Sequence, residues 1–194
     1  MIKYLIGIIA IASVLVSCGG EDNNKKEDKY YSTEVPEADV LRVGIKQLED
    51  SLVKISSNQN SDKSVTGLVQ QAYIEKLKLL YQEYPKDKDA ALSLRKVYMM
   101  YSAIGSPELS VKYADSLIEK YPNYDERWLA LQSNAVYYDM QAQPRDADKA
   151  RYYLEKLLKE YPNLDEETIE MTKSRLETID IPFEELIKQQ NQLP

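Results

Sequence analysis

The chain contains no histidine and one cysteine, and these two shortages remove most of the usual enzyme chemistry. Without histidine there is no Ser-His or Cys-His nucleophile pair, no histidine metal ligand and no side chain that titrates near neutral pH unperturbed. A single cysteine cannot form an intrachain disulfide. The remaining carboxylates and lysines show no pattern that points to a reaction. We therefore expect a protein that is not an enzyme and that uses no cofactor.

Long apolar runs are also scarce, and the most pronounced one lies at the N-terminus. A short basic start is followed by an apolar stretch over residues 4–16. This stretch is shorter than the roughly 20 residues that a membrane-spanning helix needs. Such a pattern is typical of a secretory signal peptide. We interpret residues 1–17 as a signal peptide that is absent from the mature protein.

The tetrapeptide Leu15-Val16-Ser17-Cys18 at the end of this stretch resembles a bacterial lipobox. The resemblance implies cleavage before Cys18, followed by acylation of its thiol and of its new amino group. Two or more acyl chains give stable membrane anchoring. Gly19 follows Cys18, where lipoproteins retained in the inner membrane have Asp, so the resemblance favours the outer membrane, facing the periplasm or the cell surface. The alternative is an ordinary signal peptide with an incidental cysteine.

The segment after Cys18 is polar and highly charged. Residues 21–29 have no apolar side chain, so burial cannot compensate the entropy lost on ordering. We expect a lipidated cysteine with a disordered tether over residues 18–38 and one folded domain over residues 39–194. The net charge of the whole chain is −7, with no basic cluster, which argues against nucleic acid as a partner.

The rest of the chain has the periodicity of amphipathic helices and no alternating, β-branched segment. We predict an all-α fold. Gly105 is the expected C-terminal cap of one helix, and Asn123 and Asn163 are the expected N-terminal caps of two others. The expected helices span about 40–55, 65–83, 87–103, 106–120, 123–140, 143–160, 163–179 and a short segment from 181. The expected buried side of the second helix consists of Leu68, Ala72, Leu77, Leu80, Tyr81 and Tyr84.

Three Tyr-Pro pairs recur along the chain, and each ends one of these helices. Pro85, Pro122 and Pro162 of these pairs are 37 and then 40 residues apart. Each pair is followed by another helix that begins with acidic residues. A helix pair recurring at this length is the signature of a helical solenoid, in which each repeat buries its apolar face against the next.

Counted from each Tyr-Pro pair, the pattern resembles the tetratricopeptide repeat. Trp128, Leu131 and Ala135 match positions of that repeat, whereas Arg95 and Gln132 stand where it has a small residue. The resemblance implies a helical solenoid of about three helix pairs plus a C-terminal capping helix. Together with the lipobox and tether, it is also similar in design to the tetratricopeptide lipoproteins of the outer-membrane β-barrel assembly machine.

The resemblance implies a groove lined by the first helix of each repeat, and with it a protein partner in the cell envelope. We therefore expect a lipid-anchored scaffold that binds a protein segment, within an outer-membrane assembly or secretion complex. The 16 tyrosines support an alternative, a surface lipoprotein that captures a peptide or glycan through tyrosine-rich faces. The groove candidates that the resemblance implies are Asp89, Leu92, Lys96, Met99, Met100, Glu126, Leu129, Ser133, Val136, Tyr137, Glu166, Ile169, Lys173, Leu176 and Glu177. Some of the apolar ones must belong to the core, and we select Asp89, Lys96, Met100, Glu126, Ser133, Tyr137, Glu166, Lys173 and Glu177 as the groove residues.

Two pairs of acidic residues have a spacing that resembles that of metal ligands. Asp87 and Asp89 form one pair, and Asp146 and Asp148 form the other. Both pairs lie at expected helix starts, where carboxylates stabilise the helix dipole. No further oxygen ligands follow at the spacing of a calcium loop. We therefore interpret both pairs as helix caps and expect no metal site.

Overall fold

The computed structural model describes residues 35–57 and 62–190, and within these ranges all regular structure is helical. They belong to one compact unit, Val35–Pro194. The prediction of an all-α fold is therefore confirmed for this unit. Its elements are α1 (Ala38–Ser56), α2 (Lys63–Glu83), α3 (Ala90–Ala103), α4 (Pro107–Lys120), α5 (Arg127–Val136), the π-helix η1 (Tyr137–Gln141), α6 (Ala147–Glu160), α7 (Glu166–Glu177) and α8 (Phe183–Gln190).

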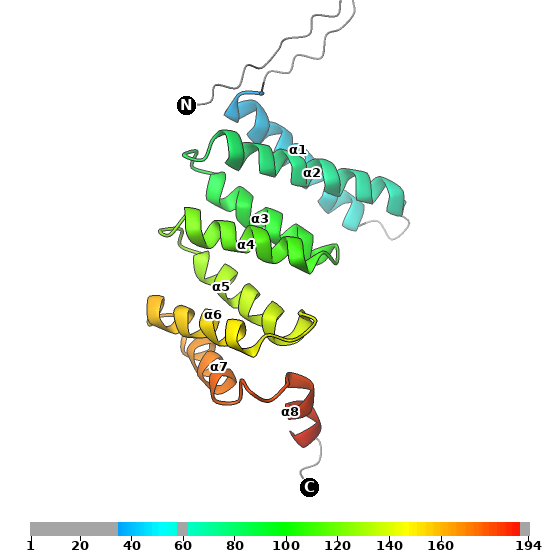
Figure 1. The fold of residues 1–194 in the computed structure, drawn as a ribbon. Coiled ribbons are helices and arrows are strands. Elements are labelled where there is room, and N and C mark those ends of the chain that lie inside the picture. Colours follow the sequence, from blue (N-terminus) through cyan, green and yellow to red (C-terminus); the bar gives the residue numbers. More distant parts are fainter. Residues whose placement is uncertain (1–34, 58–61, 191–194) are drawn as a thin grey trace, which may run out of the picture. The chain divides into compact units, whose positions relative to one another are not determined.

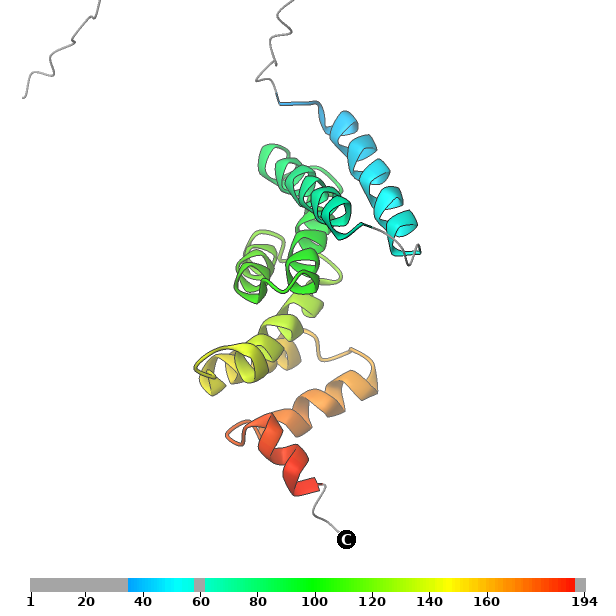
Figure 2. The same cartoon turned by 90° about the vertical axis from the view of Figure 1, so that its right-hand side faces the viewer.

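The helices of this unit are stacked in chain order, with neighbours along the chain packed on each other (Figure 1). From α1 to α6, successive helices run in opposite directions (Figure 1). In the view turned by 90°, each helix of this stack is inclined to the next one (Figure 2). Because extensive contacts join only near neighbours along the chain, each helix depends for its burial on the helices just before and after it.

A single hydrophobic core runs through this stack. Each helix from α1 to α6 contributes at least one fully buried aliphatic side chain, and Ile179 closes the core behind α7. Burial of one such side chain stabilises a fold by about 1.5–3 kcal/mol. The fully buried members are Leu41, Ile74, Leu77, Leu80, Leu94, Val97, Leu117, Leu131, Leu157 and Ile179.

The turns after the Tyr-Pro pairs repeat one hydrogen-bond pattern. The carbonyl of each tyrosine accepts a bond from the backbone N–H three residues later, at Asp87, Tyr124 and Leu164. The phenol of Tyr121 donates to the carbonyl of Pro85, 3.1 Å away, at the previous Tyr-Pro pair. The three tyrosines of these pairs are half-buried against the core. The recurring pair is therefore a structural turn, and at Tyr121 it also ties one helix pair to the preceding one.

Four expectations about helix faces and caps are wrong, and one of them is that Ala72 of α2 is buried, since it is exposed. Leu68 of α2 is 70% exposed, because α2 is longer than its neighbour α3 and its first turns extend beyond it. Tyr73 and Ile74 are buried on α2 instead. Asn163 does not cap α7, since Asp165 holds that position and its carboxylate accepts from the backbone N–H of Thr168 at 2.9 Å.

At α5 the expected cap Asn123 lies three residues too early, because α5 begins at Arg127 after a further turn. The N-cap position of α5 is Glu126, whose side chain makes no capping hydrogen bond. Gly105 follows α3 with φ of +76°, a conformation that favours glycine and that ends the helix as expected.

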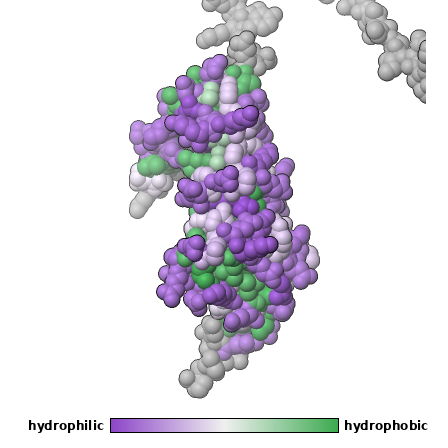
Figure 3. Space-filling view, turned by 90° about the vertical axis from the view of Figure 1, so that its left-hand side faces the viewer, coloured by the Kyte–Doolittle hydropathy of each residue, from purple (hydrophilic) through white to green (hydrophobic). Residues whose placement is uncertain are grey.

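The C-terminal helix α8 covers little of the stack. Phe183 and Ile187 of α8 are 36% and 43% exposed, and Leu186 is half-buried. On the face shown in Figure 3 hydrophilic residues predominate, and hydrophobic ones gather toward the C-terminal end. Buried Ile179, rather than α8, closes the core at this end.

Candidate binding groove

A groove of about 490 Å³ lies between α3, the start of α4, α5 and η1. This volume falls within the range of ligand-binding clefts in proteins. Met99 and Val136 on its walls are exposed, although both are large apolar residues. The complete lining is Arg95, Tyr98, Met99, Ser102, Ala103, Pro107, Ser110, Val111, Leu129, Gln132, Ser133, Val136, Tyr137 and Gln141.

Arg95 is the one lining residue that carries a charge, and its guanidinium is paired with a carboxylate of the protein. Its guanidinium donates to the carboxylate of Glu126 at 2.5 Å, and Tyr124 donates to the same carboxylate oxygen at 2.9 Å. Burial works against the charge of Arg95, but Tyr124 and Glu126 outweigh it and raise the pKa of Arg95. Burial also raises the pKa of Tyr98 to about 12, so its phenol is neutral. The groove therefore presents no unpaired charge to a ligand.

The uncharged polar side chains of the lining differ from Arg95 in their hydrogen bonding. The side chains of Ser102, Gln132, Ser133, Tyr137 and Gln141 make no hydrogen bond within the described part of the chain. All of them are exposed or half-buried. Each of these groups can both donate and accept a hydrogen bond. The groove thus combines apolar walls with free, neutral hydrogen-bonding groups.

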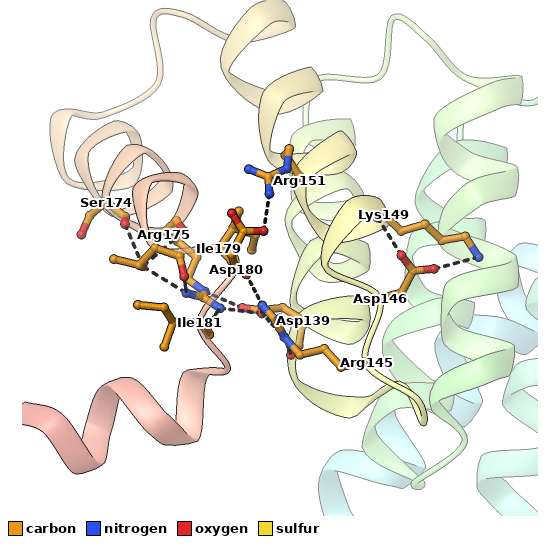
Figure 4. A network of polar contacts seen from close by, with 11 residues as sticks. Asp139, Arg145, Asp146, Lys149, Arg151, Ser174, Arg175, Ile179, Asp180 and Ile181 are labelled. Atoms are coloured by element: carbon orange, nitrogen blue, oxygen red, sulfur yellow. Dashed lines mark hydrogen bonds and ion pairs between the residues drawn. The ribbon is translucent and has the colours of Figure 1, made fainter.

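One wall of the groove is the π-helix η1, and its buried Asp139 belongs to a network of polar contacts with Arg145 and Arg175 (Figure 4). Asp139 is 6% exposed and accepts hydrogen bonds from Arg145 and Arg175 at 2.6–3.0 Å. Burial opposes the charge of Asp139, but the hydrogen bonds from Arg175 and Arg145 outweigh it and lower the pKa of Asp139. The two arginines also donate to the backbone carbonyls of Ile179, Thr178 and Ile181. We call Asp139, Arg145 and Arg175 the clasp, because they join η1 to the end of α7.

A second buried polar cluster lies behind the groove, between α4, α5 and α6. Asn134 is fully buried and donates to the carboxylate of Asp115 at 2.7 Å, and the Tyr153 phenol donates to the same oxygen at 2.6 Å. Burial is the largest influence on Asp115 and raises its pKa, because these two hydrogen bonds offset only part of the cost of desolvation. These contacts hold three helices together, and none of the three residues lines the groove.

Two of the nine selected residues line the groove, Ser133 and Tyr137, and so do three of the other candidates from the repeat register, Met99, Leu129 and Val136. Glu126 lies behind it as the partner of Arg95, and Lys96 pairs with Glu49 of α1 at 2.8 Å. Met100 is half-buried against the core. The candidates outside the lining are Asp89, Leu92, Lys96, Met100, Glu126, Glu166, Ile169, Lys173, Leu176 and Glu177.

Five of these candidates lie on α7, away from the groove. Glu166, Lys173 and Glu177 are exposed, and Lys173 approaches Glu170 of the same helix at 3.4 Å. The groove between α3 and α5 therefore does not extend to α7. The reason is packing: α7 contacts mainly α6, so its exposed face does not join α3 and α5.

The acidic pairs at the helix starts have structural partners. Asp146 caps α6 by accepting from the backbone N–H of Lys149 at 2.9 Å, and Asp87 accepts from that of Asp89 at 2.9 Å. The bond from Asp89 is the largest cause of the lowered pKa of Asp87. Within residues 35–57 and 62–190, no group of three or more Cys, His, Asp or Glu residues is placed to hold a metal ion.

Arg95 and Gln132 line the groove, although the repeat register did not place them there. Arg95 and Gln132 attracted attention only as large residues at a small position of the repeat. Asp139 and its two arginines gave no local signal, because Arg175 is 36 residues away in sequence. Cys18, the proposed signal peptide over residues 1–17 and residues 18–34 of the proposed tether lie outside the described residues; the rest of that tether, residues 35–38, leads into α1, which begins at Ala38.

Comparison of the chain with family models, with curated proteins and with solved structures found no match. Among the described residues, no helix has the length and apolar character required to cross a membrane. The groove and its chemistry are thus the basis for a functional proposal.

Proposed function

We propose that this chain is a lipid-anchored scaffold of the bacterial cell envelope that binds a segment of a partner protein in the groove between α3 and α5. The observation that carries the proposal is the groove itself, which joins exposed Met99 and Val136 to unpaired neutral polar groups. Exposed apolar surface next to hydrogen-bonding groups is typical of protein recognition sites. In this proposal the protein acts by holding its partner and catalyses no reaction.

A tetratricopeptide-like solenoid is the finer fold that goes with this function. Its support is the repeated Tyr-Pro turn and the packing of each helix on its neighbours in the chain. The lipobox-like Leu15-Val16-Ser17-Cys18 supports anchoring in the outer membrane, with the domain facing the periplasm or the cell surface. An assembly or secretion complex at that membrane is the setting that fits a scaffold of this design.

The anchor is tested by Cys18→Ala in the full-length chain. Loss of the acylated residue should abolish incorporation of radiolabelled palmitate and move the protein from the membrane fraction to the soluble fraction. A variant that remains membrane-bound and labelled would contradict the proposed anchor.

Partner binding is tested by affinity capture of the anchored protein from its own cells, followed by mass spectrometry. Val136→Glu places a charge on the groove wall at an exposed position, and Val53→Glu makes the same change on α1, where the valine is 63% exposed and outside the groove. A partner should be retained by the wild type and Val53→Glu and lost with Val136→Glu. Equal recovery with both variants would contradict the groove.

A tyrosine cluster is the observation that favours the second candidate, capture of a peptide or glycan by tyrosine-rich faces. Tyr138 stacks on Tyr153 with ring centroids 5.8 Å apart, and neighbouring Tyr152 is 53% exposed. However, Lys149 and Lys156 lie over the rings of Tyr138 and Tyr152, at 4.7 and 5.6 Å. A sugar would have to displace these cations from the rings, so the groove remains the better supported site.

A further inference from the structure

A second pocket, separate from the groove, lies between α1 and α2, the first two helices of the stack (Figure 1). Its volume of about 570 Å³ falls within the range of ligand-binding clefts. Val40 and Val43 of α1 form an apolar wall and are 60% and 59% exposed, and half-buried Leu48 continues this wall. Among the described residues, the linings of this pocket and of the groove share no member. We call it the α1–α2 pocket.

Lys76 of α2 brings a positive charge to the α1–α2 pocket without a protein partner. Four lysines in the described part of the chain are half-buried. Three of them donate to a carboxylate or a phenol of the protein, and these are Lys78, Lys96 and Lys156. Lys76 is the fourth, and it makes no hydrogen bond or ion pair with any other described residue. An anionic ligand can therefore bind this ammonium group without displacing a partner.

Gly44 of α1 allows the side chain of Lys76 to lie directly against the helix backbone. A Cβ atom at position 44 would lie 3.1 Å from Cε, 3.2 Å from Cδ and 3.3 Å from Nζ of Lys76. These distances are shorter than ordinary van der Waals contacts, so any larger residue at this position would push the lysine away. The ammonium group is thus held beside the pocket, and less side-chain freedom remains to be lost when a ligand binds.

The other polar groups of the α1–α2 pocket restrict the class of ligand. Asp39 at its edge is paired with Arg42, but its carboxylate is 87% exposed and would repel a second negative charge on a ligand. The Ser51 hydroxyl already donates to the backbone carbonyl of Gln47 at 2.8 Å. A peptide would place backbone N–H and carbonyl groups against the valine wall, whereas a hydrocarbon chain has no such groups to satisfy.

We propose that the α1–α2 pocket binds a single-chain amphiphile with one carboxylate, a free fatty acid. Its carboxylate binds the ammonium group of Lys76 and the side-chain amide of Gln47, and its hydrocarbon chain lies along Val40, Val43 and Leu48. This site goes beyond the proposed function, because a scaffold that holds its partner between α3 and α5 does not need it.

The test is photoaffinity labelling with octanoic acid that carries a diazirine on its chain. The protein is the full-length chain in phosphatidylcholine nanodiscs, whose lipid has no net charge, and labelled residues are located by mass spectrometry. Labelling should fall on α1 and α2 around the pocket, and free octanoate should compete. Shorter fatty acids should compete about two- to fourfold more weakly for each CH₂ removed. Octanamide keeps the chain without the charge and should compete at least about tenfold more weakly.

Two lysine variants test whether the carboxylate binds Lys76. Lys76→Gln removes the charge in the pocket, and Lys46→Gln removes an exposed charge of α1 outside it. Lys76→Gln should weaken binding of the probe at least about tenfold, and Lys46→Gln less than about twofold. Gly44→Ala should also weaken binding, because its methyl group displaces Lys76, although alanine favours the helix and should not lower the melting temperature.

The outcomes are distinct from those for partner binding in the groove. Equal labelling of Lys76→Gln and Lys46→Gln, labelling only outside α1 and α2, or equal competition by octanamide and octanoate would overturn this inference and leave the scaffold function standing. A lipid head group as the true ligand would appear as loss of labelling when phosphatidylglycerol is added to the nanodiscs. A peptide C-terminus would appear as stronger competition by acetyl-Ala-Val-Leu with a free carboxylate than by octanoate. Either result would overturn the assignment to a fatty acid.

Discussion

Removal of the buried carboxylate of the clasp should be among the most damaging single changes in this protein. Asp139→Asn keeps the size of the side chain and removes the charge that faces Arg145 and Arg175. The carboxylate accepts four hydrogen bonds from these two arginines, at 3.0, 2.6, 2.6 and 2.7 Å. The amide of asparagine offers a single acceptor oxygen, and its NH₂ group would face cationic donors.

The size of the effect follows from how deeply the three side chains are buried. Breaking a fully buried ion pair by removing one partner costs about 3–5 kcal/mol. Arg145 and Arg175 are 22% and 15% exposed and keep their backbone carbonyl acceptors, so water can solvate part of the charge left behind. We therefore expect the lower end, about 3 kcal/mol. For a domain of this size that corresponds to a fall in melting temperature of about 6–12 °C.

The assay is urea and thermal unfolding followed by circular dichroism, with Asp180→Asn as the matched control. Asp180 also pairs with an arginine, Arg151 at 2.6 Å, but its side chain is 82% exposed. The control should show no measurable change, because exposed ion pairs contribute little. Equal losses of stability in Asp139→Asn and Asp180→Asn would refute the reasoning that the clasp stabilises the protein because it is buried.

The same pair of variants gives a second, independent check through pH. The folded-state pKa of Asp139 lies below its ordinary value, so its contribution is fully present above the unfolded pKa of about 3.9 and is lost as pH falls through the folded pKa. The gap in stability between the wild type and Asp139→Asn should therefore be constant near neutral pH and shrink below about pH 4. A gap that persists in acid would show that the variant acts through something other than the charge.

Two further predictions concern Asp115 and the glycines. Asp115 has a raised pKa, so its contribution to stability is present below about pH 3.9 and is lost as pH rises through the folded pKa. Asp115→Asn should abolish this fall in stability, which urea unfolding between about pH 3 and pH 7 would measure. Gly105→Ala should destabilise by about 1 kcal/mol because its φ is +76°, although no atom would contact the new methyl group. Gly67→Ala, in open space inside α2, should instead stabilise by about 0.5–1 kcal/mol, so the same substitution should shift the urea midpoint in opposite directions at the two sites.

The helices were predictable because the signals that determine them are local. Apolar spacing, proline and Gly105 located each helix to within a few residues, and the Tyr-Pro pairs located the recurring turn. The exposure of Leu68 was not predictable in the same way. Its burial depends on whether a neighbouring helix reaches it, and that is set by the relative lengths of α2 and α3.

The groove was predictable only in part, for the same reason. Ser133 and Tyr137 follow from the repeat register, which places them on one face of α5 and its extension. Glu166 and Lys173 occupy the equivalent register on α7 but lie on a helix that does not join the groove. Register determines which face of a helix a residue occupies, whereas the partners of that face depend on contacts between distant parts of the chain.

The departures from the repeat pattern were the better indication of where the groove lies. Arg95 and Gln132 stand where the tetratricopeptide pattern has a small residue that allows close helix contact. Both line the groove, and a larger side chain at such a position holds neighbouring helices apart unless it is accommodated elsewhere. Arg95 could not remain there as an unpaired charge, and Glu126 together with Tyr124 supplies the compensation. Gln132 needs no such partner because it is neutral, and it is therefore left free to bind a ligand. Gln132 and Arg95 should therefore differ under mutation. Gln132→Ala should weaken partner binding with little loss of stability, whereas Arg95→Ala should also leave the Glu126 carboxylate without its ion pair and lower stability.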